Sequence, residues 1–326
     1  MEFQKPLTQL RVGDEVEGFY ALFSLAERMG SNGKPFTVLS LGDRSGSIDA
    51  KYWDHCEAVT AEDIGTAIKV RGEVSEYKGN LQFIVRRIRR VLPQDPVNMA
   101  DLVPTAPIDL DAAWGELQEA IESIADEDYR ALCALLISRS ESLFRTIPAA
   151  KSVHHAFRGG LLMHTLRMLH LADDLAANYP ELINRDLLMA GTLLHDLAKT
   201  REFSFSKLGL VQEYSVEGQL LGHIVMGAQM VDAAARELET PDEKRILLEH
   251  LILSHHGDRE FGAAVLPATP ESEVLSFIDR LDSRLEVYRE NFATLAPGTF
   301  SQRVGSLDKR IYKPSAPAAE EHKEET

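Results

Sequence analysis

Residues 185–199 read Arg185-Asp-Leu-Leu-Met-Ala-Gly-Thr-Leu-Leu-His-Asp-Leu-Ala-Lys199. The stretch is apolar almost up to its end, which predicts a buried helix. It then reaches His195 and Asp196, two adjacent side chains that are costly to bury without a partner or a ligand. Imidazole and carboxylate are the ligands of hydrolytic metal centres, so the doublet indicates a metal site at the end of a buried helix.

Five further side chains of the same ligand classes lie on neighbouring stretches with helical periodicity. Residues 159–178, 186–200, 218–238, 242–257 and 271–291 each predict a helix. Taken singly, a buried histidine is usually a hydrogen-bonded core residue, and a lone aspartate is usually a cap or half of an ion pair. Their joint occurrence in one helical region favours a shared metal site. The predicted metal ligands are His164, His195, Asp196, His223, His255, His256 and Asp279.

Two aspartates near the end of the helical region are candidates for the last metal ligand. Asp279 lies among apolar neighbours in Val274-Leu-Ser-Phe-Ile-Asp-Arg-Leu281, where a carboxylate needs a partner. Asp282 follows three residues later on a neighbouring face of the same helix. We expect Asp279 to be the ligand, with Asp282 as the alternative.

An early histidine, a His-Asp doublet and a later aspartate make this chain resemble the HD superfamily of metal-dependent phosphohydrolases. The resemblance implies a first metal held by His164, His195, Asp196 and Asp279. It implies a second metal, bridged by Asp196 and held by His223, His255 and His256. Lys199 resembles the lysine that contacts the scissile phosphate, so Asp196 and Lys199 are the expected catalytic residues. Ala198 stands where the superfamily often has glycine.

The ligand types narrow the choice of metal. Mixed nitrogen and oxygen ligands suit manganese, iron, cobalt, nickel or zinc better than magnesium. Together with the two sites that the resemblance implies, this makes two divalent transition-metal ions the expected cofactors.

Residues 12–92 predict short strands rather than helices. Four stretches carry β-branched or aromatic residues in partial alternation, with turn signals between them: 36–41, 47–53, 67–74 and 81–85. About five strands in this length suit a small barrel. The run Leu41-Gly-Asp-Arg-Ser-Gly-Ser-Ile-Asp-Ala-Lys-Tyr-Trp53, followed by Val70-Arg-Gly-Glu-Val74, resembles the OB-fold of nucleic-acid-binding proteins.

Cations and aromatic side chains interleave in this N-terminal part. Such a mixture binds single-stranded nucleic acid through base stacking and phosphate contacts. The ordinary alternative is that half of the aromatics form the barrel core and the arginines make a solvated edge. The expected nucleic-acid contacts are Lys51, Trp53, Tyr77, Lys78, Phe83 and Arg86.

Charge is distributed unevenly along the 326 residues. The net charge of −16 argues against a protein that wraps duplex nucleic acid without specificity. Residues 1–95 nearly balance, with 13 basic against 14 acidic side chains, so this part can still meet a polyanion. The remainder carries 22 basic against 37 acidic side chains, an excess that bound divalent cations would partly offset.

The predicted organisation is an α+β multidomain chain. Residues 1–95 form an OB-fold domain, 96–110 a proline-marked linker, 111–312 an all-α HD domain and 313–326 a disordered tail. No apolar run reaches the length of a membrane span, and the N-terminus has no apolar signal core. Two cysteines are too few for a disulfide framework, so we expect a cytoplasmic protein. A homo-oligomer is compatible with the sequence.

A narrower resemblance covers most of the chain. An OB-like N-terminus joined to an HD domain is similar to the YhaM family, as are four motifs: His154-His-Ala-Phe-Arg-Gly-Gly-Leu-Leu-Met-His164, Leu194-His-Asp-Leu-Ala-Lys-Thr200, Glu217-Gly-Gln-Leu-Leu-Gly-His-Ile224 and Leu253-Ser-His-His-Gly257. The resemblance implies a 3′-to-5′ exonuclease that acts mainly on single-stranded RNA, with DNA as the alternative. It also implies manganese as the usual activator and nucleoside 5′-monophosphates as products.

Two other functions compete with the nuclease. An HD nucleotidase or cyclic-nucleotide phosphodiesterase would use the barrel for regulation. The Gly-Tyr-Pro signature of HD enzymes that cleave cyclic dinucleotides is absent near His223, where the chain reads Leu-Gly-His-Ile. A non-catalytic nucleic-acid-binding regulator is disfavoured because every metal position is filled.

Overall fold

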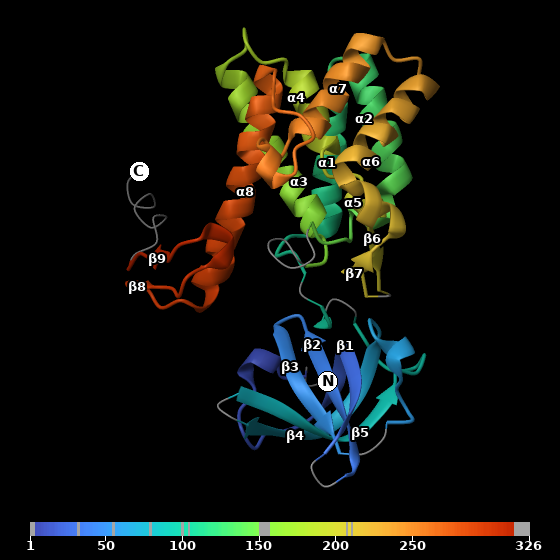
Figure 1. Ribbon diagram of the computed structural model, residues 1–326, viewed down its shortest axis with the longest axis vertical. Helices are drawn as coiled ribbons and strands as arrows, with labels where there is room; N and C mark the ends of the chain where they lie inside the picture. Colours follow the sequence, from blue (N-terminus) through green and yellow to red (C-terminus); the bar gives the residue numbers. More distant parts are fainter. Residues whose placement is uncertain are drawn as a thin grey trace.

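The computed structural model describes residues 4–315, apart from 31–32, 54–55, 78–79, 99–100, 104, 150–156, 207 and 210. A β-barrel and a helical domain follow each other along the chain and lie one below the other in Figure 1. This order confirms the architecture that the sequence predicts. No helix among the described residues is long and apolar enough to cross a membrane.

The N-terminal domain is a closed barrel of five strands, in the order β1-β2-β3-β5-β4. The strands are β1 (Glu15–Met29), β2 (Pro35–Asp43), β3 (Gly46–Tyr52), β4 (Ala67–Tyr77) and β5 (Asn80–Arg90). All neighbouring pairs are antiparallel except β3 with β5. Alternate side chains point inward, as the period of a strand requires, and build a core that includes Tyr20, Leu39, Leu41, Val74 and Phe83.

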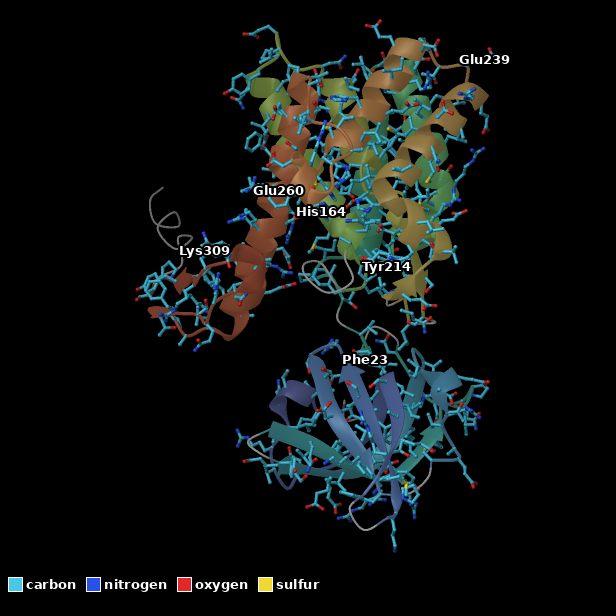
Figure 2. All side chains as sticks on the ribbon, viewed as in Figure 1. Phe23, His164, Tyr214, Glu239, Glu260 and Lys309 are labelled. Carbon is cyan, nitrogen blue, oxygen red and sulfur yellow. The ribbon has the colours of Figure 1, made fainter. Side chains whose placement is uncertain are left out.

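Ala21 lies in the middle of β1, where this strand passes from its pairing with β4 to its pairing with β2. It pairs with Gly42 of β2 and with Ala67 of β4. Figure 2 shows Phe23 at the barrel edge nearest the helical domain, so this part of β1 faces that domain.

The two domains meet through an apolar cluster. Leu208, from the helical domain, is buried together with Ala21 of the barrel and with Leu102 and Val103 of the linker. The two domains also approach closely at Gly65, where the Cβ atom of any other residue would lie 2.4 Å from the Cβ of Ser206. The linker therefore packs between the domains rather than acting as an open spacer.

Where the structure describes the helical domain, it contains seven longer α-helices and one short one. They are α1 (Leu110–Glu122), α2 (Glu127–Phe144), α3 (Gly160–Asn178), α4 (Arg185–Leu194), α5 (Lys199–Glu202), α6 (Val216–Glu237), α7 (Asp242–Ser254) and α8 (Pro270–Thr294). Every residue of α4 from Leu187 to Leu194 is buried, so this helix is the centre of the domain. Asn184 caps its start by accepting a hydrogen bond from the Leu187 backbone N–H.

Two small hairpins complete the chain. β6 (Phe203–Phe205) and β7 (Val211–Tyr214) carry Leu208 at their connection, and the sequence did not predict them. β8 (Thr299–Phe300) pairs with β9 (Tyr312–Lys313) beyond the end of α8. Strand β9 thus includes Lys313, the first residue of the predicted tail, and residues 316–326 lie outside the described part.

Candidate metal centre

The His-Asp doublet lies where α4 ends, in the interior of the domain. His195 is the C-cap of α4, and both His195 and Asp196 are buried. The His195 Nδ1 lies 2.9 Å from the Thr192 carbonyl oxygen. Since a carbonyl only accepts, Nδ1 carries the proton and Nε2 is left with a free lone pair.

Asp196 stands between two groups of histidines. Its Oδ2 lies 3.3 Å from the Nε2 of His195 and 3.8 Å from the Nε2 of His164. Its Oδ1 lies 3.6 Å from the Nε2 of His223 and 3.8 Å from the Nε2 of His255. One carboxylate therefore presents a separate oxygen to each group, which is the arrangement that a bridging ligand needs.

The remaining acids lie around His164, which Figure 2 shows in the interior of the helical domain. Asp279 Oδ1 is 3.3 Å from the Nε2 of His164, on the same side as Asp196. Asp282 Oδ2 is 2.7 Å from the opposite ring nitrogen, Nδ1. This placement favours Asp279 as the ligand and makes Asp282 the group that orients the His164 ring.

Each of the five histidines predicted as metal ligands has a hydrogen-bond partner at Nδ1. The partners are the carbonyl oxygens of Thr192, Ile252 and Phe261 and the carboxylates of Glu202 and Asp282. Metal-binding histidines nearly always donate their second ring N–H in this way, which fixes the tautomer and the ring orientation. All five Nε2 atoms are thereby available as ligands.

The donor set fits a divalent metal. The Oδ1 of Asp196 and the Nε2 atoms of His223 and His255 are buried without a hydrogen-bond partner among the described residues. Leaving such a group unsatisfied costs about 1–3 kcal/mol, and a cation among them would satisfy all three. The ligand atoms of His223, His255 and His256 lie within 4.8 Å of one another, as do those of His164, His195 and Asp196.

The protonation states also suit metal binding. Burial alone would raise the pKa of Asp196, but its polar neighbours, with the positive charge of Lys199 foremost, outweigh it and hold that pKa well below its usual range. Burial lowers the pKa of His255, and the neighbouring His256 lowers it further. Burial likewise lowers the pKa of the His164 ring, but Asp279 and Asp282 reverse this and raise it to about 9. A metal at His164 would replace that proton.

Lys199 lies against the carboxylate of Asp196. Its Nζ is 2.6 Å from the Oδ2 of Asp196. Burial opposes its charge, but the negative charge of Asp196 outweighs this and raises the pKa of the ammonium group. Lys199 is thus a fixed positive charge beside the cluster.

Glu202 is a site residue that the sequence did not single out. It ends α5, is buried, and accepts from both the backbone N–H and the Nδ1 of His223 at 3.0 Å. Gly222, just before this histidine, has φ 71° and ψ 160°, a left-handed conformation that suits glycine and breaks α6. No sequence spacing links Glu202 to His223, because the contact depends on the unpredicted hairpin between them.

Replacing Glu202 with alanine is expected to free the His223 ring and to weaken divalent-metal binding by about 10–100-fold, as for other residues that orient metal ligands. Glu202→Gln retains an acceptor oxygen and should recover most of the affinity. Calorimetric titration with Mn²⁺ measures this, with thermal unfolding as the check that both variants fold. Equal affinity in wild type and Glu202→Ala would contradict the orienting role.

The residues of the barrel predicted to contact nucleic acid differ in their exposure and in their partners. Trp53 is 60% exposed and Tyr77 is likewise exposed, and the Lys51 Nζ lies 5.8 Å and 4.7 Å from their ring centroids. Arg86 is exposed but lies 2.6 Å from Glu73 in an ion pair. Lys78 lies outside the described residues.

The prediction for Phe83 is wrong. This side chain is only 1% exposed and packs beside Tyr20 in the barrel core. It lies on the inward face of β5, and partial alternation in the sequence did not define which face of that strand is buried.

Comparison with known proteins agrees with both domains. Residues 161–284 match the family model described as HD domain, and residues 23–91 match the one described as OB-fold nucleic acid binding domain. The chain is 38% identical over 310 residues to the 3′-5′ exoribonuclease YhaM of Bacillus subtilis (strain 168), covering 93% of this chain and 96% of that protein. It is 37% identical over 317 residues to the protein of the same name from Shouchella clausii (strain KSM-K16), covering 95% and 97%. The YhaM protein of Geobacillus sp. (strain WCH70) is 36% identical over 317 residues, 95% of each chain.

Proposed function

Since this chain belongs to the YhaM family of 3′-5′ exoribonucleases, we propose that it is a metal-dependent enzyme that shortens single-stranded RNA from its 3′ end. The observation that carries this proposal is the position of Asp196, with one oxygen toward His164 and His195 and the other toward His223 and His255. An OB-fold domain on the same chain makes a polymer the suitable substrate.

The proposed cofactors are two divalent ions, with manganese as the expected metal. His164, His195, Asp196 and Asp279 would hold one ion, and Asp196, His223, His255 and His256 the other. Nitrogen-rich sites of this kind also accept iron, cobalt, nickel or zinc.

Bound ions of this kind supply Lewis acidity toward the phosphate and an activated water. The protein's own contribution is to fix the ligands and to add charge. The Nδ1 partners hold each imidazole in one orientation, so little reorganisation is needed during the reaction. Lys199 Nζ contributes positive charge where negative charge grows on the phosphate oxygens. The product released at each step would be a nucleoside 5′-monophosphate.

The barrel would capture the strand on its 5′ side. Lys51, Trp53 and Tyr77 form an exposed group of one cation and two aromatic rings, which we call the barrel cluster. Bases stack on such rings and phosphates meet the cation. The cluster lies near the last residues of β3 and β4. RNA held at this cluster would extend from the barrel domain to the metal centre.

The double variant Trp53→Ala/Tyr77→Ala is expected to weaken binding of single-stranded RNA by about tenfold or more, because each stacked base contributes about 1–3 kcal/mol. Hydrolysis of a small phosphodiester such as bis-p-nitrophenyl phosphate should stay unchanged, since it does not reach the barrel. Fluorescence anisotropy with labelled RNA gives the affinity, and Tyr179→Ala, an exposed aromatic of the helical domain, is the control. RNA affinity equal to wild type would remove the barrel cluster from the proposal.

End-labelled oligonucleotides test the function itself. With Mn²⁺ we expect 5′-labelled RNA to give a ladder that shortens from the 3′ end, and 3′-labelled RNA to release a labelled mononucleotide at once. A matched DNA oligonucleotide in the same assay measures the preference for RNA. Cleavage of small or cyclic nucleotides alone would favour the nucleotidase or phosphodiesterase, and no metal-dependent product at all would contradict an enzymatic role.

Two further properties belong to this proposal. We place the activity in the cytoplasm, because both cysteines, Cys56 and Cys133, are free and buried, which suits a reducing compartment. A homo-oligomer remains compatible with the chain, and size-exclusion chromatography with light scattering measures it.

A further inference from the structure

A pocket of about 260 Å³ opens directly beside the metal centre. His256, a predicted metal ligand, forms part of its wall. The other side is α8, in the turns that precede and follow Asp279, and the loop before α8 closes the pocket with Leu266. A group bound here would lie beside His256.

The apolar part of the pocket is open to solvent. Phe277 is 67% exposed, and Leu266 is also exposed. A phenylalanine on a helix surface normally turns toward the core, as Phe144 does in α2. An exposed aromatic ring at the wall of a pocket offers a stacking surface, and every nucleobase has a face that can use it.

Arg280 adds a positive charge to the wall of the pocket. It forms no ion pair among the described residues, whereas Arg201, at another edge of the metal centre, is paired with Glu217 at 2.8 Å. The guanidinium of Arg280 lies 5.3 Å from the centroid of the Phe261 ring, which orients it without cancelling its charge. It is therefore available to a phosphate or to the edge of a base.

The polar part of the pocket matches a sugar. The side chains of Asp258, Glu273 and Ser276 line the pocket together with Phe277 and Arg280. Ionised carboxylates only accept hydrogen bonds, so they suit the 2′- and 3′-hydroxyl groups of a terminal ribose. They would repel a second phosphate, which restricts the pocket to the end of a strand.

We propose that this pocket receives the 3′-terminal nucleoside of the RNA, with its base against Phe277, its ribose toward Asp258 and Glu273, and Arg280 at its charged edge. The volume of about 260 Å³ lies just below the usual range of ligand pockets, about 300–1,000 Å³, so the pocket has room for one nucleoside and not two. Release of one nucleotide per step follows from that size. This inference rests on the proposed function and names the part of the site that selects the strand end.

Binding of the reaction product tests the pocket without turnover. Adenosine 5′-monophosphate and inorganic phosphate are titrated calorimetrically into the Mn²⁺-loaded full-length protein. Wild type should bind the nucleotide at least about tenfold more tightly than phosphate, because only the nucleotide reaches the stacking surface. Phe277→Ala should lower nucleotide affinity to within about threefold of phosphate, leaving phosphate affinity unchanged. Arg280→Gln should also weaken the nucleotide by several-fold.

Leu285→Ala is the matched control, because this side chain is 55% exposed on the same helix two turns beyond Phe277. It should bind both ligands as wild type does. Wild-type nucleotide affinity in Phe277→Ala, or equal loss in Leu285→Ala, would overturn the pocket assignment. The end-labelled RNA assay on wild type separates the two claims: a 3′ ladder together with unchanged nucleotide binding in Phe277→Ala would refute the pocket and leave the nuclease standing.

Discussion

Replacing Asp196 with asparagine is expected to lower kcat on single-stranded RNA by at least about 10³-fold, a loss typical of removing a group on which the whole catalytic unit depends. The physical reason is that asparagine keeps the shape but offers one neutral oxygen and one N–H₂ group. It cannot present an anionic oxygen both to His164 and His195 and to His223 and His255. Single-turnover hydrolysis of labelled RNA measures the loss.

The control is Asp174→Asn, an exposed aspartate on α3 outside the metal centre. It removes the same charge from the same domain and should retain wild-type activity. Circular dichroism should show unchanged helical content in both variants, and metal analysis should show a deficit in Asp196→Asn alone. An Asp196→Asn enzyme within tenfold of wild type would refute the bridging role.

Removal of metal is the second change with a large expected effect. Dialysis against a chelator should abolish RNA hydrolysis, because the remaining groups provide no substitute for an activated water. Mn²⁺ added back should restore the rate, and Mg²⁺ should restore much less, since Mg²⁺ prefers oxygen ligands in octahedral geometry. The melting temperature should also fall by about 5 °C or more, because ions bound at 1,000 times their Kd stabilise the native state by about 4 kcal/mol.

Activity and melting temperature, measured together, distinguish a catalytic from a structural role of the ions. A stability change without an activity change would make the ions structural. Full activity in protein shown by elemental analysis to be metal-free would contradict the metal-dependent reaction. Restoration by Mg²⁺ equal to that by Mn²⁺ would contradict the nitrogen-rich ligand set.

The helices and their ligands were predictable because both depend on local pattern. Burial on one face repeats every 3.6 residues, and His164, His223 and Asp279 stand on such faces. The doublet His195-Asp196 is conspicuous because it interrupts a buried stretch. Burying a polar side chain without a partner or ligand is costly, so such residues in apolar stretches indicate a site.

The parts that the sequence missed depend on contacts between distant segments. Glu202 meets His223 across the β6–β7 hairpin, and Leu208 packs on the barrel from that same hairpin. Strands of three and four residues carry too little periodicity to be recognised. The prediction that Phe83 contacts nucleic acid was wrong for a different reason. Both faces of β5 carry large side chains, so alternation alone did not distinguish the core face from the surface face.

Anomalous diffraction at the manganese edge, from crystals grown with Mn²⁺, decides whether Asp196 bridges two metal ions. We expect two peaks, one beside His164, His195 and Asp279 and the other beside His223, His255 and His256, with an oxygen of Asp196 toward each. A single peak, or two peaks of which one lies away from Asp196, would rule out the bridge.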